Sequence, residues 1–197
     1  MITAILLAAG RSTRMGDKNK LLLPYNGRLL IEHAVEQLLA GKWGEVIVVT
    51  GNEKEEIGRL IEKNNYPVKP VINNDYNKGM TTSIQAGVQA MSEKASGFMV
   101  CQADMPLLKG LHYQLLIDAF ENLKTKQGIV VPQYQGKRGN PVVFSVSYKP
   151  EVLAEDYPEG CRNIVRKYTE NITFVEMPDN AILVDVDTAD DYKELSD

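Results

Sequence analysis

The chain has 197 residues, a formal net charge of −4 and a hydrophobic fraction of 44%. This length is enough for one domain with a substantial core. The weak negative charge excludes a general nucleic-acid binder, which needs a basic surface. The sequence holds two cysteines, Cys101 and Cys161, and two histidines. They support neither a disulfide framework nor a zinc site, so we expect reduced thiols in a cytoplasmic protein.

The first apolar stretch, residues 1–9, has no basic region before it and runs directly into a charged loop. We therefore expect no secretory signal peptide there. No apolar run approaches the roughly 18 residues that a membrane-spanning helix needs. The composition predicts a soluble protein with no membrane or nucleic-acid partner. Nothing in it demands an oligomer, so we expect a monomer.

Apolar runs that end at glycine or turn residues alternate with segments of helical periodicity along the chain. Residues 45–50 are a β-branched run between Gly44 and Gly51, which is typical of a buried strand. Pro70 interrupts another run and places it at an edge or a bend of the sheet. The predicted strands are residues 2–9, 45–50, 68–72, 97–102, 128–132, 173–177 and 182–186. The predicted helices are residues 29–39, 53–63, 77–91, 111–123, 150–155, 161–167 and 188–195.

This alternation predicts an α/β protein with a Rossmann-like three-layer sandwich, in which a mostly parallel sheet has right-handed crossovers and helices on both faces. Residues 133–144 read as a hairpin that turns through Gly136 to Gly139, so we expect the sheet to be mixed. No linker, repeat or low-complexity segment divides the chain. Residues 1–197 are therefore predicted to form a single domain.

A cationic loop follows the first predicted strand, where Gly10 ends the apolar run. Open α/β sheets bind ligands at the carboxyl ends of their strands. A glycine allows close backbone approach, and cations neutralise phosphate. The loop lacks both the Gly-x-Gly-x-x-Gly pattern of dinucleotide sites and the Gly-Lys-Ser/Thr ending of a P-loop. The loop contains one acid, Asp17, and four cations, which are Arg11, Arg14, Lys18 and Lys20. It could be an anion-binding site or an ordinary solvated loop, and the sequence leaves both readings open.

Two aspartates follow apolar runs in similar settings. Asp104 comes after residues 97–102, and Asp187 comes after residues 182–186. Each could simply cap the helix that follows it. If both lie at the same rim of the sheet, opposite the cationic loop, they predict a Mg²⁺ site that uses few protein ligands together with substrate phosphates.

Hydroxyl residues open the helix that begins in residues 77–83. Such side chains cap the first N–H groups of a helix, and the same N–H groups bind anions. The sequence leaves the two readings open. The histidines, His33 and His112, fall in helices that are expected to pack on the sheet, and we assign them no role.

The segment LLAAGRSTRMGDKNKLLLP resembles the signature loop of the sugar-nucleotide-type nucleotidyltransferases. The later segments GMTTSIQAGV, CQADMPLL, PQYQGKRGNPVVF and DVDTADDY follow in the order and spacing of the molybdenum-cofactor cytidylyltransferase family. The resemblance covers nearly the whole chain and implies the nucleotide-diphospho-sugar transferase type of fold. Its Leu7-Ala8-Ala9-Gly10 form looks like that of CTP-using members, whereas GTP-using relatives typically have two glycines there.

The resemblance implies transfer of CMP from CTP to the phosphate of molybdenum cofactor, with release of pyrophosphate and with Mg²⁺ as the cofactor. It implies catalytic roles for Arg14, Lys20 and Asp104, and metal binding by Asp104 and Asp187. Acceptor binding falls to Gly139, Asn140 and Arg162. The implied nucleotide-binding residues are Leu7, Ala8, Ala9, Gly10, Arg11, Arg14, Lys20, Gly79, Thr82 and Ser83.

One segment departs from the family pattern. Where the family usually has Gly-Asp-x-Gly-Ala-Arg, this chain has Tyr157-Pro158-Glu159-Gly160-Cys161-Arg162, near the expected acceptor site. Two alternatives therefore stay open. The first is the same reaction type with GTP or with another acceptor. The second is a non-catalytic accessory protein that serves a molybdenum hydroxylase client, although the intact Lys20, Asp104 and Asp187 favour catalysis.

Overall fold

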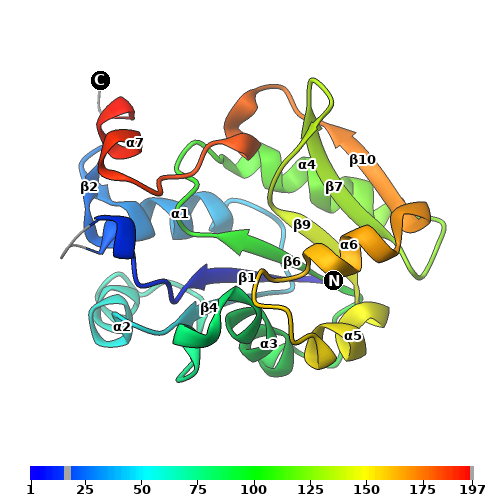
Figure 1. Ribbon diagram of the computed structural model, residues 1–197, viewed down its shortest axis with the longest axis horizontal. Coiled ribbons are helices and arrows are strands. Elements are labelled where there is room, and N and C mark those ends of the chain that lie inside the picture. The colour runs from blue at the N-terminus through cyan, green and yellow to red at the C-terminus, as the bar shows by residue number, and fades with distance from the viewer. Residues whose placement is uncertain (16–18, 196–197) are drawn as a thin grey trace.

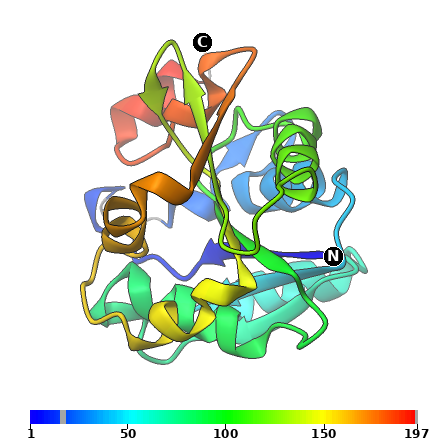
Figure 2. The same ribbon diagram turned by 90° about the vertical axis from the view of Figure 1, so that its right-hand side faces the viewer.

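The computed structural model describes residues 1–15 and 19–195. Within these residues, eight strands form one mixed sheet in the order β10-β7-β9-β6-β1-β4-β5, with β8 paired to β7. Figures 1 and 2 show α1 and α4 on one face of this twisted sheet and α3 and α5 on the other. The sheet strands are β1 (Ile2–Ala8), β4 (Glu45–Thr50), β5 (Lys69–Ile72), β6 (Gly97–Gln102), β7 (Ile129–Tyr134), β8 (Lys137–Arg138), β9 (Val142–Ser145) and β10 (Ile172–Glu176).

The helices fill the two outer layers, and a small ribbon of β2 (Pro24–Tyr25) and β3 (Arg28–Leu29) leads into α1. The helices are α1 (Leu30–Leu39), α2 (Lys54–Lys63), α3 (Met80–Ala90), α4 (Gly110–Glu121), α5 (Lys149–Ala154), α6 (Arg162–Lys167) and α7 (Ala189–Glu194). In the part of the chain that the structure describes, no helix has both the length and the apolar character to cross a membrane.

Side-chain alternation along the strands divides the core into two apolar layers. On β1, Leu6 joins the layer beneath α1, α2 and α4, whereas Ile5 joins the layer beneath α3, α5 and α6. Both side chains are fully buried. Strands covered on both faces read as continuous apolar runs, which is why the sequence indicated this three-layer α/β architecture. That fold prediction is confirmed.

Strand directions explain where the ligand-binding edge lies. β1 pairs in parallel with both β4 and β6, and β4 pairs in parallel with β5. β9 runs antiparallel to both β6 and β7, as the predicted hairpin requires. β7 therefore runs in the same direction as β6. The carboxyl ends of the central strands β4, β1 and β6 thus meet at one edge.

One predicted strand is wrong. Residues 182–186 form no strand, and a 3-10 helix (Asn180–Leu183) begins the segment instead. The Asp179 carboxylate caps that turn by accepting from the Ala181 amide at 3.0 Å. Further along, the Val186 amide donates to the Asp104 carbonyl at 2.9 Å. The alternating apolar residues of this segment therefore pack across the end of the sheet instead of adding a strand to it.

Candidate active site

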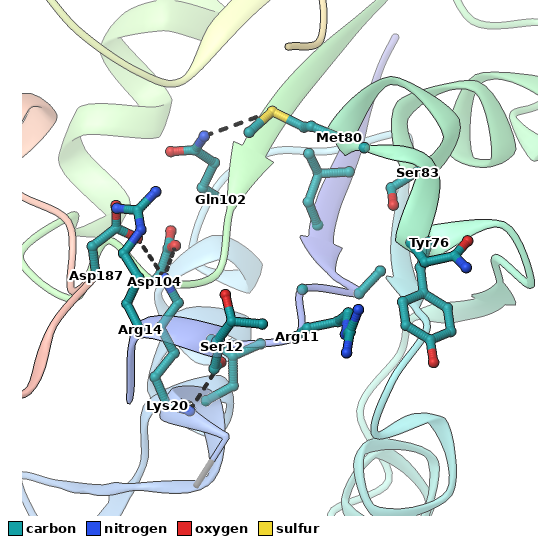
Figure 3. A pocket seen from close by; sticks show the side chains of 17 residues that line it. Arg11, Ser12, Arg14, Lys20, Tyr76, Met80, Ser83, Gln102, Asp104 and Asp187 are labelled. Atoms are coloured by element: carbon teal, nitrogen blue, oxygen red, sulfur yellow. Dashed lines mark hydrogen bonds and ion pairs between the residues drawn. The ribbon is translucent and has the colours of Figure 1, made fainter. Parts of the chain in front are cut away.

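Backbone hydrogen bonds join β1 and its following loop to the segments that follow β6 and β4, at the edge where these strands end. The Ala103 amide donates to the Leu7 carbonyl at 3.2 Å, and the Asn52 amide reaches the Ala9 carbonyl at 3.5 Å. A cavity of about 360 Å³ opens at this edge, and we call it the first cavity (Figure 3). Its volume falls at the lower end of the range for small-molecule sites.

Lys20 is held in place by the loop that precedes it. The Ser12 hydroxyl accepts from the Lys20 amide at 3.1 Å, and Ser12 itself has φ of 49°. The Asn19 side chain accepts from the Leu21 amide at 2.9 Å and so caps the short 3-10 helix Lys20–Leu22. Lys20 is only 9% exposed. Its side chain therefore enters the cavity wall from a fixed backbone.

The Lys20 ammonium lies between two carboxylates. Its Nζ donates to Asp104 Oδ2 at 2.6 Å and to Asp187 Oδ1 at 2.9 Å. Arg14 binds the second oxygen of Asp187 from the solvent side. Figure 3 shows these four side chains together on one wall of the cavity. Removing one partner of Lys20 would leave a buried charge without compensation, so these ion pairs hold the side chains of the wall together.

The pKa values in this cluster follow from its charges. Burial alone would lower the pKa of the Lys20 ammonium, but the two carboxylates outweigh burial and raise it above its ordinary value. The hydrogen bond from Lys20 lowers the pKa of Asp187, and the charges of Lys20 and Arg14 add to this effect. The pKa of nearby Asp185 is raised, first by desolvation and then by the negative charges of Asp187 and Asp104. These shifts in pKa favour the charged forms of Lys20 and Asp187.

The structure rejects the alternative in which the two aspartates cap helices. The residue that precedes α4 is Lys109, five residues after Asp104. The Thr188 hydroxyl caps α7 by accepting from the Asp191 amide at 3.2 Å. Both aspartate side chains are thus directed to the cavity wall and Lys20.

The carboxylates fit a divalent cation. Asp104 Oδ1 is buried and has no hydrogen-bond partner among the described residues. An orphaned buried carboxylate oxygen is an available ligand for a hard cation, and Mg²⁺ commonly takes only one or two carboxylates together with water and phosphate oxygens. In residues 1–15 and 19–195, no group of three or more His, Cys, Asp or Glu side chains forms a closed metal cage. The two aspartates therefore suit an open site that is completed by a substrate.

The start of α3 and the segment before it form the opposite side of the cavity, where Figure 3 shows Ser83 and Tyr76. No side chain caps this helix, which begins after Gly79 with φ of 120°. The Ser83 hydroxyl accepts from the Asn73 amide group at 3.0 Å. The predicted hydroxyl caps are therefore absent from the described helix start, and the hydroxyls bond to neighbouring segments instead.

Most of the predicted nucleotide-binding residues converge on the first cavity. Two of them do not line it, as far as the structure describes the site. Ala8 is buried in the core layer beneath α1, and the Thr82 hydroxyl bonds to the backbone carbonyls of Asp75 and Gly79. Lys18 lies outside the described residues. The predicted site residues that line the first cavity are Leu7, Ala9, Gly10, Arg11, Arg14, Lys20, Gly79, Ser83, Asp104 and Asp187.

A second cavity of about 310 Å³ lies beside the first, on the α3 and α6 side of the sheet. All three predicted acceptor residues line it, namely Gly139, Asn140 and Arg162. A Cβ on Gly139 would lie 2.3 Å from the Ile182 carbonyl oxygen, so only glycine permits this approach. Among the described residues, the two cavities have Met80 and Gln102 in common.

Sequence reasoning missed several lining residues. In the first cavity these are Ser12, Thr13, Leu21, Tyr76, Asn77, Met80 and Gln102. In the second they include Arg138 and Arg166. Gln102 had a detectable signal, because it ends the strand that leads to Asp104. Tyr76 and Arg166 had none, since each reaches its cavity from a distant segment of the chain.

The chain belongs to the MobA-like NTP transferase domain family, whose model matches residues 4–172. It is a nucleotidyltransferase, and membership in this family implies a nucleoside triphosphate substrate.

Two curated relatives match nearly the full length. The chain is 29% identical to nicotine blue oxidoreductase of Paenarthrobacter nicotinovorans, covering 98% of this chain and 96% of the relative. It is 27% identical to molybdenum cofactor cytidylyltransferase of Escherichia coli strain K12, covering 97% of this chain and 93% of the relative.

Solved structures share the fold. A nucleotidyl transferase from Methanothermobacter aligns with a TM-score of 0.85 and 21% identity, over 99% of this chain and 95% of that one. The Rv0371c protein of Mycobacterium tuberculosis, in complex with manganese, aligns with a TM-score of 0.81 and 22% identity, over 98% and 97% of the two chains. The architecture is therefore that of known nucleotidyltransferases.

Proposed function

We propose that this enzyme transfers CMP from CTP to the phosphate of molybdenum cofactor and releases pyrophosphate, with Mg²⁺ as its cofactor. The main support for the proposal is the position of the Lys20 ammonium, which lies between Asp104 and Asp187 at the wall of the first cavity. The near-full-length similarity to a molybdenum cofactor cytidylyltransferase supports the choice of substrates. The free thiols Cys101 and Cys161 fit a cytoplasmic location.

In this proposal the first cavity binds the nucleotide. Gly10 leaves open space at the loop, since a Cβ there would meet nothing within 4 Å, so phosphate groups can approach the backbone closely. Arg14 and Arg11 are exposed at the mouth and neutralise the triphosphate. Lys20 binds the α-phosphate, where negative charge develops during transfer.

Asp104 and Asp187 hold Mg²⁺, which supplies positive charge at the phosphates when it is bound. These carboxylates share the Lys20 ammonium in the structure. The lysine thereby keeps the two side chains close together and oriented before a substrate arrives. Such preorganisation reduces the reorganisation needed during the reaction.

The second cavity binds the acceptor. Its connection to the first cavity at Met80 and Gln102 brings an acceptor phosphate toward the α-phosphate of the nucleotide. An acceptor phosphate is already anionic at neutral pH, so attack on the α-phosphorus needs no general base. The main task of the site is to hold two anions in line, and positioning together with fixed cations achieves this.

Ala9 is the proposed determinant of CTP use. It is 4% exposed and contributes to the wall of the first cavity next to Gly10. A Cβ on Gly51 would come within 2.9 Å of the Ala9 Cβ, so the wall is tightly packed behind it. A methyl group held in this way limits the room for a base and favours the smaller pyrimidine.

An oxidoreductase is the second candidate, because one near-full-length relative carries that name. Pyrophosphate release separates the candidates, since an oxidoreductase produces none. We expect the purified protein with Mg²⁺ and molybdenum cofactor to release pyrophosphate from CTP and much less from GTP, ATP or UTP. Preference for GTP would overturn the CTP assignment. No release with any nucleoside triphosphate would overturn the proposed function and favour an accessory role or the oxidoreductase.

A further inference from the structure

The carboxylate pair Asp104 and Asp187 already holds a cation that belongs to the protein. Lys20 Nζ donates to Asp104 Oδ2 at 2.6 Å and to Asp187 Oδ1 at 2.9 Å. An ammonium is a compact positive charge with three N–H donors, so two carboxylates can share it. The negative charge that a divalent cation would meet at this pair is therefore partly balanced by a side chain of the chain itself.

Water screens this pairing only weakly. The Lys20 and Asp104 side chains are 11% and 20% exposed. Like charges repel more strongly where solvent is excluded, because the effective dielectric constant there is far below that of water. An ammonium that stayed on Asp104 and Asp187 would thus oppose the binding of a divalent cation to them. Arg14 opposes it less, since its side chain is 69% exposed and solvated.

The structure gives Lys20 a way to leave the carboxylates. Its backbone is fixed, because its amide donates to the Ser12 hydroxyl at 3.1 Å. Its ammonium, in contrast, is carried on a flexible four-carbon stem. Lys20 lines the first cavity together with Gly10 and Arg14, where an entering phosphate would offer other acceptors. The ammonium can therefore exchange one set of anionic oxygens for another while the loop stays in place.

We propose that Lys20 occupies the carboxylate pair in place of a divalent cation in the nucleotide-free protein, and that a triphosphate entering the first cavity draws the ammonium away. The inference rests on the proposed function for metal binding by Asp104 and Asp187. It adds that the protein alone binds its divalent cation weakly, and that nucleotide and cation bind cooperatively. By thermodynamic linkage, each then raises the affinity for the other by the same factor.

A lysine that only oriented the two carboxylates would have the opposite effect. Its removal would let Asp104 and Asp187 separate, and the affinity for a divalent cation would fall. Removal of a competing ammonium raises that affinity, and Asp104 Oδ1, which has no hydrogen-bond partner among the described residues, already offers a ligand. The two roles therefore predict changes of opposite sign in a single measurement, the affinity for the metal alone.

The direct test is Mn²⁺ binding to the full-length protein without nucleotide, followed by the electron paramagnetic resonance signal of the free ion. Mn²⁺ prefers the same oxygen ligands as Mg²⁺. We expect the Kd to fall by about tenfold or more in Lys20→Gln and in Lys20→Met, which remove the charge. Lys20→Arg keeps the charge and should stay near the wild-type value. Unchanged or weaker Mn²⁺ binding in both neutral variants would overturn the proposal.

Two control variants separate competition at the pair from a general change in charge. Lys63→Gln removes an exposed ammonium at the end of α2 and should leave the Kd for Mn²⁺ unchanged. Arg14→Gln removes the solvent-side partner of Asp187 and should tighten Mn²⁺ binding less than Lys20→Gln does. Tightening of equal size in Lys63→Gln or in Arg14→Gln would contradict a specific role of Lys20.

Thermal unfolding covers a variant that is unstable without the lysine. A ligand that binds only the folded state stabilises it in proportion to the logarithm of its binding. Mn²⁺ should therefore raise the Tm of Lys20→Gln more than that of the wild type. A variant that folds only with Mn²⁺ supports the proposal, and one that Mn²⁺ stabilises no more than the wild type contradicts it.

Displacement of the ammonium is tested with α,β-methylene-CTP, which cannot release pyrophosphate. Water-proton relaxation distinguishes Mn²⁺ on the protein from Mn²⁺ on the unbound nucleotide. With saturating analogue, the wild type and Lys20→Gln should differ in Mn²⁺ affinity much less than they do without it, because the ammonium has left the carboxylates. A difference that does not shrink would show that the triphosphate leaves Lys20 in place.

Failure of this inference differs from failure of the proposed function. Tighter Mn²⁺ binding in Lys20→Gln, without pyrophosphate release by the wild type from any nucleotide, would keep the competition and reject the reaction. Normal pyrophosphate release from CTP, with Mn²⁺ binding that is no tighter in the neutral variants, would keep the reaction and reject the competition.

Discussion

The two cavities lie side by side, but their cationic side chains differ in whether they are paired with carboxylates. In the first, the cations Lys20 and Arg14 are paired with Asp104 and Asp187. In the second, an apolar floor is bordered by arginines, of which Arg166 has no partner within the described residues. The first cavity holds a prearranged ionic cluster, which suits a chemical step. The second has unused cations, which suit the selection of a ligand.

Burial explains why substitutions in the two cavities are expected to have different effects. The Lys20 side chain is 11% exposed, so removing one member of its cluster leaves a buried charge without compensation. Arg162 is exposed at the rim, where loss of its ion pair with Glu159 costs little stability. We therefore expect substitutions in the Lys20, Asp104 and Asp187 cluster to lower activity strongly, whereas those at the rim of the second cavity mainly alter ligand preference.

The largest expected effect comes from Asp104→Asn. The amide keeps the shape of the side chain but removes the charge that is proposed to hold Mg²⁺, so Mg²⁺-dependent pyrophosphate release should fall below detection while the protein stays folded. Stopped-time pyrophosphate assays over a range of Mg²⁺ concentrations measure this. Asp118→Asn, on the exposed side of α4, is the matched control and should retain activity. Full activity in Asp104→Asn would remove the metal-binding role.

Lys20→Ala comes next. It removes the cation proposed to stabilise charge on the α-phosphate, and loss of one such contact lowers turnover by roughly 10²–10³-fold. Single-turnover rates with CTP check the prediction. Lys63→Ala, at the exposed end of α2, is the control. An unchanged rate constant in Lys20→Ala would argue against any contact with the transferred phosphate.

Thr81→Val tests whether the segment before α6 shapes the second cavity more than the first. The Thr81 hydroxyl donates to the Tyr157 carbonyl and accepts from the Gly160 amide at 2.9 Å, and so joins the start of α3 to the segment that leads into α6. Losing these buried bonds should lower the free energy of unfolding by about 1–3 kcal/mol and raise the acceptor KM more than the CTP KM. Denaturant unfolding and steady-state kinetics measure both, and Thr81→Ser should restore them. Equal changes in the two KM values would contradict a selective role of this segment in the second cavity.

Ala9→Gly should have the smallest effect. Removing one methyl group from the wall of the first cavity should relax the proposed preference for CTP over GTP by about tenfold, the lower end of the range for one such group in a binding pocket. The ratio of kcat/KM for the two nucleotides is the measurement. If the ratio does not move, base selection lies in other residues of the cavity, and Tyr76, on its opposite side, becomes the first residue to test.

The sequence by itself determined much of the architecture. Continuous apolar runs such as residues 45–50 predicted strands covered on both faces, and their alternation with helices predicted a mainly parallel sheet. Parallel strands end at a common edge, so Gly10 and Asp104 were placed at the same rim from the sequence alone. Segment 182–186 was misassigned, because its apolar alternation satisfies a strand and a crosswise packed segment equally well.

Only the tertiary structure decided which distant side chains meet. Lys20 lies between Asp104 and Asp187 because three segments far apart in the chain pack at one edge, and no local pattern encodes those distances. The second cavity formed by Arg138 and Arg166 arises in the same way, from a hairpin and a short helix brought together over the sheet. Local sequence fixes periodicity and turns, whereas contacts between remote segments depend on the packing of the whole core.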